Sequence, residues 1–287
     1  MMRKICTMLL ALAVLTAALP IAAAESAAFT ETTGFIDAGD HQIPYTMLIP
    51  NGPGPFPAVV MSHGYGSNRE EAGGGYALMA PLLAEAGIAS IRFDVIGCGE
   101  SATDYMEFTL QANIDDAVKC ADYIAGQSAV NADRIGVMGW SMGGGVALLA
   151  AGTDARFKSV LTWAGAYYDG AVNEEEYAIA LKDGYYESTF EWRDPLKQSP
   201  RMYEVQKQLK VSEIFPQSTA PVCAINGTLD DVVPPETADK IVALSENPAS
   251  KAVLLEGADH TFHIFTGDMT FFEALMQATL EWFKATL

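Results

Sequence analysis

Short apolar runs alternate along this chain with longer segments of helical length. Runs typical of strands lie at 43–49, 58–62, 89–93, 134–138, 159–163, 222–225 and 252–255. Segments typical of helices lie at about 76–86, 110–125, 142–151, 236–245 and 268–286. Nearly continuous apolar strands are typical of a sheet buried on both faces. The alternation therefore predicts an α/β fold with a mostly parallel sheet and helices on both faces.

One connection is too long for this pattern. The segment of about 165–218 separates two predicted strands, and connections of that length in a compact domain are commonly lids or binding insertions. Nine of the 49 residues from Tyr167 to Phe215 are aromatic, whereas aromatic residues make up 10% of the chain. We expect a lid insertion whose rings face the substrate, with Tyr185 and Trp192 as candidates. The alternative is that the rings only attach the insertion to the body.

The first residues resemble a secretory signal. Arg3 and Lys4 precede the apolar run 8–19, and Ala22-Ala23-Ala24 offers a small-residue cleavage site. A membrane anchor is the weaker interpretation, because the run is short for a span and Pro20 ends it. We expect a signal peptide over 1–24, a mature domain over 25–287, and secretion to the periplasm or the exterior.

The net charge of the chain limits the classes of macromolecule that it is expected to bind. Lys and Arg number 17 and Asp and Glu 36, so the net charge is −19, and loss of two basic residues with the leader gives 15 − 36 = −21. Such acidity argues against nucleic acid and anionic membranes. The cysteines after the leader (Cys98, Cys120, Cys223) have neither ligand spacing nor the density of a disulfide scaffold. We expect no metal and no cofactor.

The motif Gly139-Trp140-Ser141-Met142-Gly143 stands between a predicted strand and a predicted helix. A G-x-S-x-G sequence in that context predicts a nucleophile elbow, in which a sharp turn exposes the serine and only small residues fit beside it. The helix that follows directs free N–H groups toward an oxyanion. Ser141 is therefore the candidate nucleophile.

A serine hydroxyl needs a base to take its proton. His260 and His263 follow the last predicted strand, where the order Ser, acid, His of such enzymes places the base. His260 is favoured because it comes directly after the strand end. His41 lies in the N-terminal strand region and His63 at the predicted oxyanion loop.

The acid should follow the preceding strand. There the sequence Gly227-Thr228-Leu229-Asp230-Asp231 offers two aspartates, of which Asp230 is favoured over Asp231. Asp169, after the strand ending at Trp163, is a third option, and Asp259 is expected to be structural.

An oxyanion hole needs two backbone N–H donors that converge on one point. Met142, directly after the nucleophile, should supply one. Tyr65, in the glycine-containing sequence His63-Gly64-Tyr65-Gly66-Ser67, should supply the other. Asp94 lies on the wrong strand for the acid, and we expect it to brace this oxyanion loop.

Together these residues resemble the α/β-hydrolase superfamily, and within it the bacterial cinnamoyl or feruloyl esterases. The matching motifs are His63-Gly64, Phe93-Asp94, Gly97-x-Gly99-x-Ser101, the Ser141 elbow, Gly227-x-x-Asp230-x-x-Val233-Pro234 and Glu256-Gly257-Ala258-Asp259-His260. The resemblance implies that Ser141, Asp230 and His260 are nucleophile, acid and base. It also implies a lid subdomain over the acyl group. Trp140 and Met142 stand where these esterases commonly carry His and Gln, and Trp140 is a further candidate for substrate binding.

We therefore expect a secreted serine hydrolase that cleaves carboxylic esters of aryl or hydroxycinnamic acids through an acyl-enzyme. Its substrate would be a small ester, and neither nucleic acid nor a membrane would be a partner. One alternative is a serine exopeptidase of the same fold, in which Glu174-Glu175-Glu176 holds a substrate amino terminus. The other is a binding protein that has lost the chemistry. The oligomeric state stays open.

Overall fold

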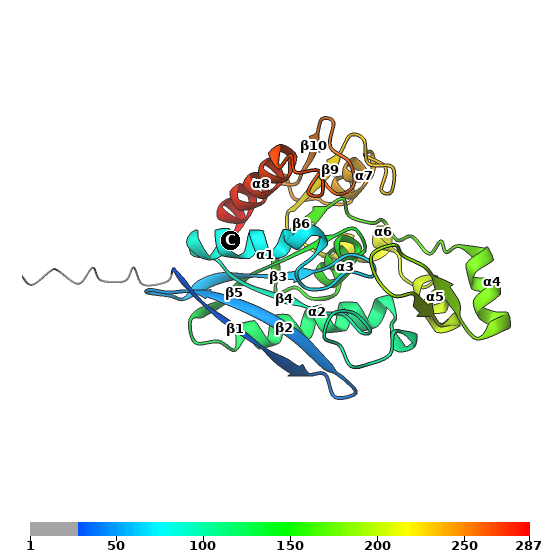
Figure 1. Cartoon of the computed structure of the whole chain (residues 1–287). Helices are drawn as coiled ribbons and strands as arrows, with labels where there is room; N and C mark the ends of the chain where they lie inside the picture. The colour runs from blue at the N-terminus through cyan, green and yellow to red at the C-terminus, as the bar shows by residue number, and fades with distance from the viewer. Residues whose placement is uncertain (1–27) are drawn as a thin grey trace, which may run out of the picture.

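A central sheet organises the molecule, whose computed structural model describes residues 28–287 (Figure 1). The predicted signal peptide, 1–24, lies outside the described residues. The sheet has eight strands in the order β1-β2-β4-β3-β5-β6-β9-β10. They are β1 (Phe29–Asp37), β2 (Gln42–Pro50), β3 (Phe56–Ser62), β4 (Ala89–Phe93), β5 (Val130–Trp140), β6 (Phe157–Trp163), β9 (Val222–Gly227) and β10 (Lys251–Leu255). In this spatial order, β4, β3, β5, β6 and β9 each pair in parallel with the next strand. β2 pairs antiparallel with both β1 and β4.

Helices cover both faces of this sheet, as predicted. One apolar cluster joins the sheet to α1 (Gly75–Glu85) and α8 (Thr270–Thr286). A second cluster, on the opposite face, joins it to α2 (Leu110–Ala125), α3 (Met142–Thr153) and α7 (Thr237–Val242). Since strand side chains alternate between faces, the apolar strands supply residues to both clusters. The predicted α/β-hydrolase fold is confirmed.

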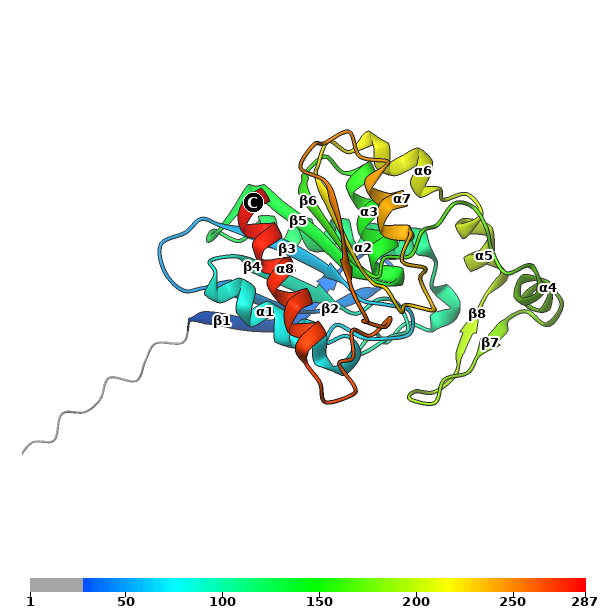
Figure 2. The same ribbon diagram turned by 90° about the horizontal axis from the view of Figure 1, so that it is seen from above.

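The long connection between β6 and β9 forms a structure of its own. It contains α4 (Glu174–Asp183), a hairpin of β7 (Tyr186–Ser188) and β8 (Leu196–Gln198), α5 (Pro200–Gln206) and α6 (Val211–Ile214). Figures 1 and 2 both show α4 and the hairpin projecting from one end of the body. Tyr203 and Phe215 are almost completely buried. These rings attach the insertion to the body, as the alternative interpretation of its aromatic residues supposed.

Residues 28–287 contain neither a candidate membrane span nor a candidate metal cluster. No helix in this range has both the length and the apolar character that crossing a bilayer requires. Nor do these residues bring three or more His, Cys, Asp or Glu side chains together in a way that could hold a metal ion. Cys98, Cys120 and Cys223 are buried free thiols.

Candidate active site

The Ser141 backbone adopts a conformation that is rare for a residue with a side chain. Its φ is 53° and its ψ is −117°, between the end of β5 and the first turn of α3. A Cβ at Gly139 would lie 1.9 Å from the carbonyl oxygen of Gly143, so the turn closes only with glycine there. The Ser141 N–H donates to the carbonyl of Trp163 at 2.8 Å, and the Ser141 carbonyl accepts from the Ala166 N–H at 2.8 Å. These bonds hold the strained turn in place.

His260 and Asp230 form a close pair. The Nδ1 of His260 lies 2.8 Å from Oδ2 and 3.0 Å from Oδ1 of Asp230. A carboxylate only accepts hydrogen bonds, so Nδ1 carries a proton and Nε2 of the neutral ring is free to accept one. The Asp230 side chain is fully buried, and its Oδ1 also accepts from the N–H groups of Val232 and Val233 at 2.9 and 2.8 Å. The loop after β9 therefore fixes the carboxylate, and the carboxylate orients the imidazole.

The alternative bases are engaged elsewhere. The ring of His263 packs edge-on against Phe271, with centroids 4.7 Å apart, and its Nε2 lies 3.9 Å from Asp259. Asp259 also accepts from the backbone N–H groups of Thr261 and His263, which supports the expected structural role. His41 contacts Asp40 and Asp116 at the far end of the chain's first hairpin.

The alternative acids are also placed away from the histidine. Asp231 is exposed. Asp169 accepts a hydrogen bond from the Ser212 hydroxyl within the insertion. Of the aspartates weighed from the sequence, only Asp230 is paired with His260 in the described part of the chain.

Two backbone amides near Ser141 are available as donors. Within residues 28–287, the N–H groups of Tyr65 and Met142 donate to no other protein group. The carbonyl of Gly64, one residue earlier, accepts from Nδ1 of the buried His63 at 2.7 Å. The Nε2 of His63 accepts from the Val95 N–H at 3.2 Å, and burial lowers the pKa of His63. His63 thus holds the backbone of the oxyanion loop as a neutral ring.

Asp94, which we expected to brace the oxyanion loop, holds the segment that directly follows it. Its carboxylate accepts from the Arg69 backbone N–H at 2.7 Å and from the Glu100 N–H at 2.9 Å, and it also pairs with the Arg69 guanidinium. Asp94 is 1% exposed. A buried charge of this kind is tolerated when it is paired and hydrogen-bonded, and here the partners tie the strand end of β4 to the segment after the oxyanion loop.

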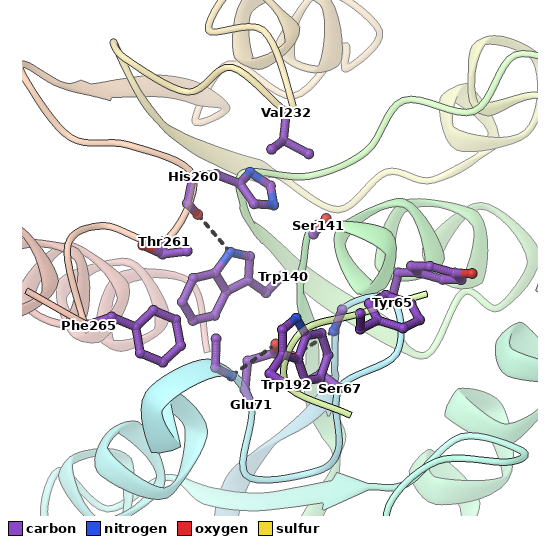
Figure 3. Close-up of a pocket in the computed structure, with 13 residues that line it drawn as sticks. Tyr65, Ser67, Glu71, Trp140, Ser141, Trp192, Val232, His260, Thr261 and Phe265 are labelled. Atoms are coloured by element: carbon purple, nitrogen blue, oxygen red, sulfur yellow. Dashed lines mark hydrogen bonds between the residues drawn. The ribbon is translucent and has the colours of Figure 1, made fainter. Parts of the chain in front are cut away.

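Ser141 and His260 open into one cavity of about 650 Å³ (Figure 3). It is lined by Gly64, Tyr65, Ser67, Glu71, Ala72, Trp140, Ser141, Phe190, Trp192, Val232, His260, Thr261 and Phe265. Apolar side chains surround its mouth: Trp192 from the insertion, Val232 from the acid loop and Phe265 from the base loop are each more than 60% exposed. A concave, mainly apolar site with a few polar groups is typical of a small-molecule pocket.

One of the predicted substrate-binding residues, Tyr185, needs correction. Tyr185 does not line this cavity, because its ring lies instead beside the Lys197 ammonium, 4.4 Å from the ring centroid. Trp140 does reach the cavity wall but is only 2% exposed, and its ring packs against Trp163 and Phe272. Its Nε1 donates to the His260 carbonyl at 3.2 Å (Figure 3), so Trp140 mainly supports the base loop. Trp192 is placed as predicted.

Sequence reasoning missed several lining residues, among them Phe190, Phe265 and Glu71. Phe190 was one of the aromatic residues of the insertion, but nothing in its local pattern distinguished it from the rings that are buried. Phe265 follows the base by five positions and has no periodic neighbours. Glu71 stands in a charged run, Arg69-Glu70-Glu71, which by itself is typical of a solvated surface. It is 7% exposed.

Comparison with known proteins places this site in a family. Residues 76–287, more than half of the chain, match the model of the prolyl oligopeptidase family. The chain belongs to that family. It is therefore an α/β hydrolase, and the elbow, the paired Asp230 and His260 and the insertion lie on a known hydrolase fold. The resemblance to the α/β-hydrolase superfamily is confirmed.

Individual relatives of this family member are more distant. It is 30% identical over 227 residues to the 2,6-dihydropseudooxynicotine hydrolase of Paenarthrobacter nicotinovorans. The aligned region covers 77% of this chain and 57% of that protein. The chain thus spans little more than half of that relative. Among solved structures, the ferulic acid complex of Est1E from Butyrivibrio proteoclasticus superposes with a TM-score of 0.71 at 21% identity, covering 88% of this chain and 98% of Est1E. The α/β hydrolase GrgF from Penicillium sp. sh18 gives 0.75 at 18% identity, covering 90% and 99%. At such identities the likeness concerns the fold.

Proposed function

We propose that this protein is a serine hydrolase that cleaves carboxylic esters with aromatic acyl groups, through an acyl-enzyme on Ser141. The observation that carries the proposal is the His260 ring, which is held by the buried Asp230 and opens with the strained Ser141 into one largely apolar cavity. Nucleophile, base and acid follow the carboxyl ends of β5, β10 and β9, which are parallel strands of one sheet with β6 between β5 and β9. This arrangement supports a catalytic triad.

In the acylation step, Nε2 of His260 takes the proton of the Ser141 hydroxyl as Oγ attacks the ester carbonyl. As negative charge forms on the carbonyl oxygen, that oxygen accepts hydrogen bonds from the N–H groups of Tyr65 and Met142. The proton then passes from His260 to the leaving alcohol, and the C–O bond to the alcohol breaks. Asp230 keeps Nδ1 protonated and stabilises the imidazolium between these two transfers.

Deacylation repeats the sequence with water. His260 takes one proton of a water molecule, and the resulting hydroxide attacks the acyl carbon. The tetrahedral intermediate collapses, and the bond to Ser141 Oγ breaks. The proton on His260 returns to that oxygen, the acid is released and the enzyme is restored. Water is the second reactant, and no bond in the cycle is oxidised or reduced.

The walls of the cavity support an aromatic acyl group. The rings of Tyr65 and Phe190 lie 5.6 Å apart, and Phe190 packs edge-on against Trp192 at 5.2 Å. Together they form a continuous aromatic surface beside the nucleophile. Burial of one ring against such a surface contributes roughly 1.5–3 kcal/mol, a difference that an acetyl group cannot supply.

A serine peptidase is the second candidate, because the family match favours it. The acidic sequence Glu174-Glu175-Glu176 does not support this reading, since it begins α4 and lines no part of the cavity. Lys207 pairs with Glu174, and Asn173 caps the helix by accepting from the N–H groups of Glu175 and Glu176. These carboxylates stabilise the helix start.

The test compares kcat/KM on p-nitrophenyl acetate, methyl ferulate and aminoacyl-nitroanilides. We expect methyl ferulate to be preferred, and Ser141→Ala to lose activity by a factor on the order of 10³ or more while its fold remains intact by circular dichroism. Ser128→Ala, in the exposed turn before β5, is the matched control and should retain wild-type activity. A preference for the nitroanilides over every ester would favour the peptidase. A Ser141→Ala variant with more than about a tenth of wild-type activity would remove the serine mechanism.

We also propose that the protein is exported, on the evidence of the charged, apolar and small-residue segments over 1–24. Expression of the full chain in a bacterial host, followed by fractionation and N-terminal sequencing, tests this. A mature chain that begins at Glu25 outside the cytoplasm is expected. Recovery of uncleaved protein in the cytoplasm would contradict it.

A further inference from the structure

The mechanism leaves one buried carboxylate in the active-site cavity unused. Glu71 lines the cavity, yet only 7% of it is exposed. Its backbone has a φ of 63° and a ψ of 174°, a conformation that L-residues other than glycine rarely adopt. Backbone strain of this kind persists only where surrounding contacts maintain it, and it gathers at functional sites. The contacts of Glu71 therefore indicate its role.

These contacts lead directly to the oxyanion loop, defined here as residues His63–Ser67. The Oε2 of Glu71 accepts from the Gly64 N–H at 2.6 Å, and Oε1 accepts from the Ala72 N–H at 3.1 Å (Figure 3). A Cβ at Gly64 would lie 3.4 Å from Oε1 of Glu71 and 3.5 Å from Cβ of Ser141. A side chain at this position would therefore contact both groups, so Gly64 lies close to the carboxylate and to the nucleophile.

This contact controls the next amide along the chain. The Gly64 carbonyl is held by His63, and the Gly64 N–H is held by Glu71. With both peptide units that flank Gly64 tied, the direction of the Tyr65 N–H is set, because that N–H belongs to the same peptide plane as the Gly64 carbonyl. The Gly64 carbonyl also accepts from the Ser67 N–H at 3.2 Å. Loss of the Glu71 bond would therefore free the preceding peptide unit and loosen the direction of the donor without releasing it fully.

Opposing effects act on the pKa of the Glu71 carboxyl group. Burial raises its pKa to about 7, and the hydrogen bonds from Gly64, Ala72 and Ser67 together with nearby His260 oppose that shift. Other titratable groups face it from neighbouring elements, namely Tyr76 on α1 and Cys98 after β4. Burial raises the pKa of each, and the charge of Glu71 adds to both effects. Both therefore stay neutral where Glu71 ionises.

We propose that Glu71 is a positioning residue for the oxyanion hole: its carboxylate, by accepting from the Gly64 and Ala72 amides, aims the Tyr65 N–H at the reacting carbonyl. This rests on the proposed function. The ionised group accepts from both amides with full strength. A protonated group must present one oxygen as a hydroxyl, which weakens one of the two bonds. The oxyanion loop therefore loosens as pH falls, apart from any protonation of His260.

Glu71→Gln tests the role, because an amide has one acceptor oxygen and cannot hold both N–H groups. Removal of an oxyanion donor costs on the order of 10²–10³ in kcat, and a misdirected donor should cost less, so we expect kcat on methyl ferulate to fall about tenfold. KM should change less than about threefold, since ground-state binding does not use the donor. Glu85→Gln, on the exposed face of α1, is the control and should match wild type.

Inhibition separates positioning from substrate binding. An aryl trifluoromethyl ketone forms a hemiketal with Ser141 and places an oxyanion in the hole, whereas ferulate, the product acid, does not. We expect Glu71→Gln to weaken the ketone about tenfold and ferulate little. Equal weakening of both would overturn the proposal in favour of a direct contact with the substrate. Unchanged kcat and unchanged ketone inhibition would overturn it as well.

The pH profile gives a second, independent measure. In wild type, the acid limb of log kcat/KM should be steeper than the slope of one that a single histidine gives, and Glu71→Gln should restore a slope of one. If the variant does not fold, the wild-type slope decides, and a slope of one would overturn the proposal. Ser141→Ala is assayed in the same experiments. If this variant remains active, the proposed function is wrong, whereas an effect of Glu71→Gln on its own tests only the role of Glu71.

Discussion

At the scale of single residues, the site depends on groups whose surroundings are fixed by backbone. Ser141 is exposed by a strained turn that glycines permit, and Asp230 accepts from two N–H groups of its own loop. His260 is held both by Asp230 through its ring and by Trp140 through its carbonyl. The Asp230 carboxylate and the His260 ring are thus held in place before reaction, and fixed groups of this kind stabilise developing charge most effectively.

Asp230→Asn should reduce kcat by a factor on the order of 10³ or more. An amide in that position no longer favours the tautomer with a proton on Nδ1, so Nε2 ceases to be a good acceptor. Asp231→Asn, at the exposed neighbouring position, is the matched control and should stay within about twofold of wild type in an ester assay. Activity in Asp230→Asn together with loss in Asp169→Asn would move the acid to the insertion.

Glu71 also makes a prediction about stability. Its pKa is raised from 4.5 to about 7 in the folded protein, so between these values the folded state binds more protons than the unfolded state. Stability should therefore be fully present below about pH 4.5 and decrease as pH rises through 7, by about 3 kcal/mol for this group alone. Urea unfolding of wild type and Glu71→Gln at pH 5 and pH 8 measures the difference. A wild type that gained stability relative to the variant with rising pH would contradict the assignment.

At the scale of elements, the apolar pattern predicted the buried structure well. The strand predicted at 89–93 and the helix at 110–125 have the predicted limits, because burial on most sides leaves a continuous apolar run or a clear amphipathic period. β1 was missed. It pairs only with β2 and its side chains are mostly exposed, so its sequence, Phe-Thr-Glu-Thr-Thr-Gly, carries no core pattern. An edge strand held mainly by backbone hydrogen bonds therefore has no recognisable apolar pattern in its sequence.

The insertion was predicted as a segment but not in detail. Its helices and hairpin strands are short, and a helix such as α5, with seven residues, is too brief to show a period. The aromatic residues indicated a ring-lined structure, yet composition alone does not separate Tyr203, which is buried, from Trp192, which faces the cavity. That distinction depends on how the insertion folds back over the body.

Some aromatic rings of the insertion line the cavity and others do not, so the two groups can be compared by mutation. Phe190→Ala and Trp192→Ala should reduce kcat/KM on methyl ferulate more than on p-nitrophenyl acetate, by about three- to tenfold in the ratio, because only the larger acyl group meets these rings. Tyr185→Ala lies outside the cavity and is the matched control, with an unchanged ratio expected. If all three variants lose activity equally on both esters, the rings serve only to hold the insertion together.

At the scale of the whole molecule, the dominant feature is negative charge. Acidic residues outnumber basic ones by 36 to 17, and two carboxylates, Asp230 and Glu71, lie at the active site. A summed field of this kind acts on any charged substrate before it reaches the cavity. It has little effect on a neutral ester, whose binding depends on the apolar walls. The net negative charge of the molecule should therefore select against anionic substrates, an effect that no single residue of the cavity provides.

This selection predicts that an anionic ester is used poorly at low salt and regains activity as salt rises. We would compare p-carboxyphenyl acetate with its neutral methyl ester, p-methoxycarbonylphenyl acetate, since the two leaving groups are similar in size. The methyl ester has the better leaving group, and this difference is present at every salt concentration, so only the change of the ratio with salt is interpreted. The Debye length falls from about 30 Å at 0.01 M to about 10 Å at 0.1 M ionic strength, so repulsion beyond the cavity mouth should be largely screened at the higher value. The ratio of kcat/KM, anionic over neutral, should therefore rise several-fold over that range. A ratio that is flat with salt would mean that the acidic surface lies away from the cavity mouth and does not influence substrate choice.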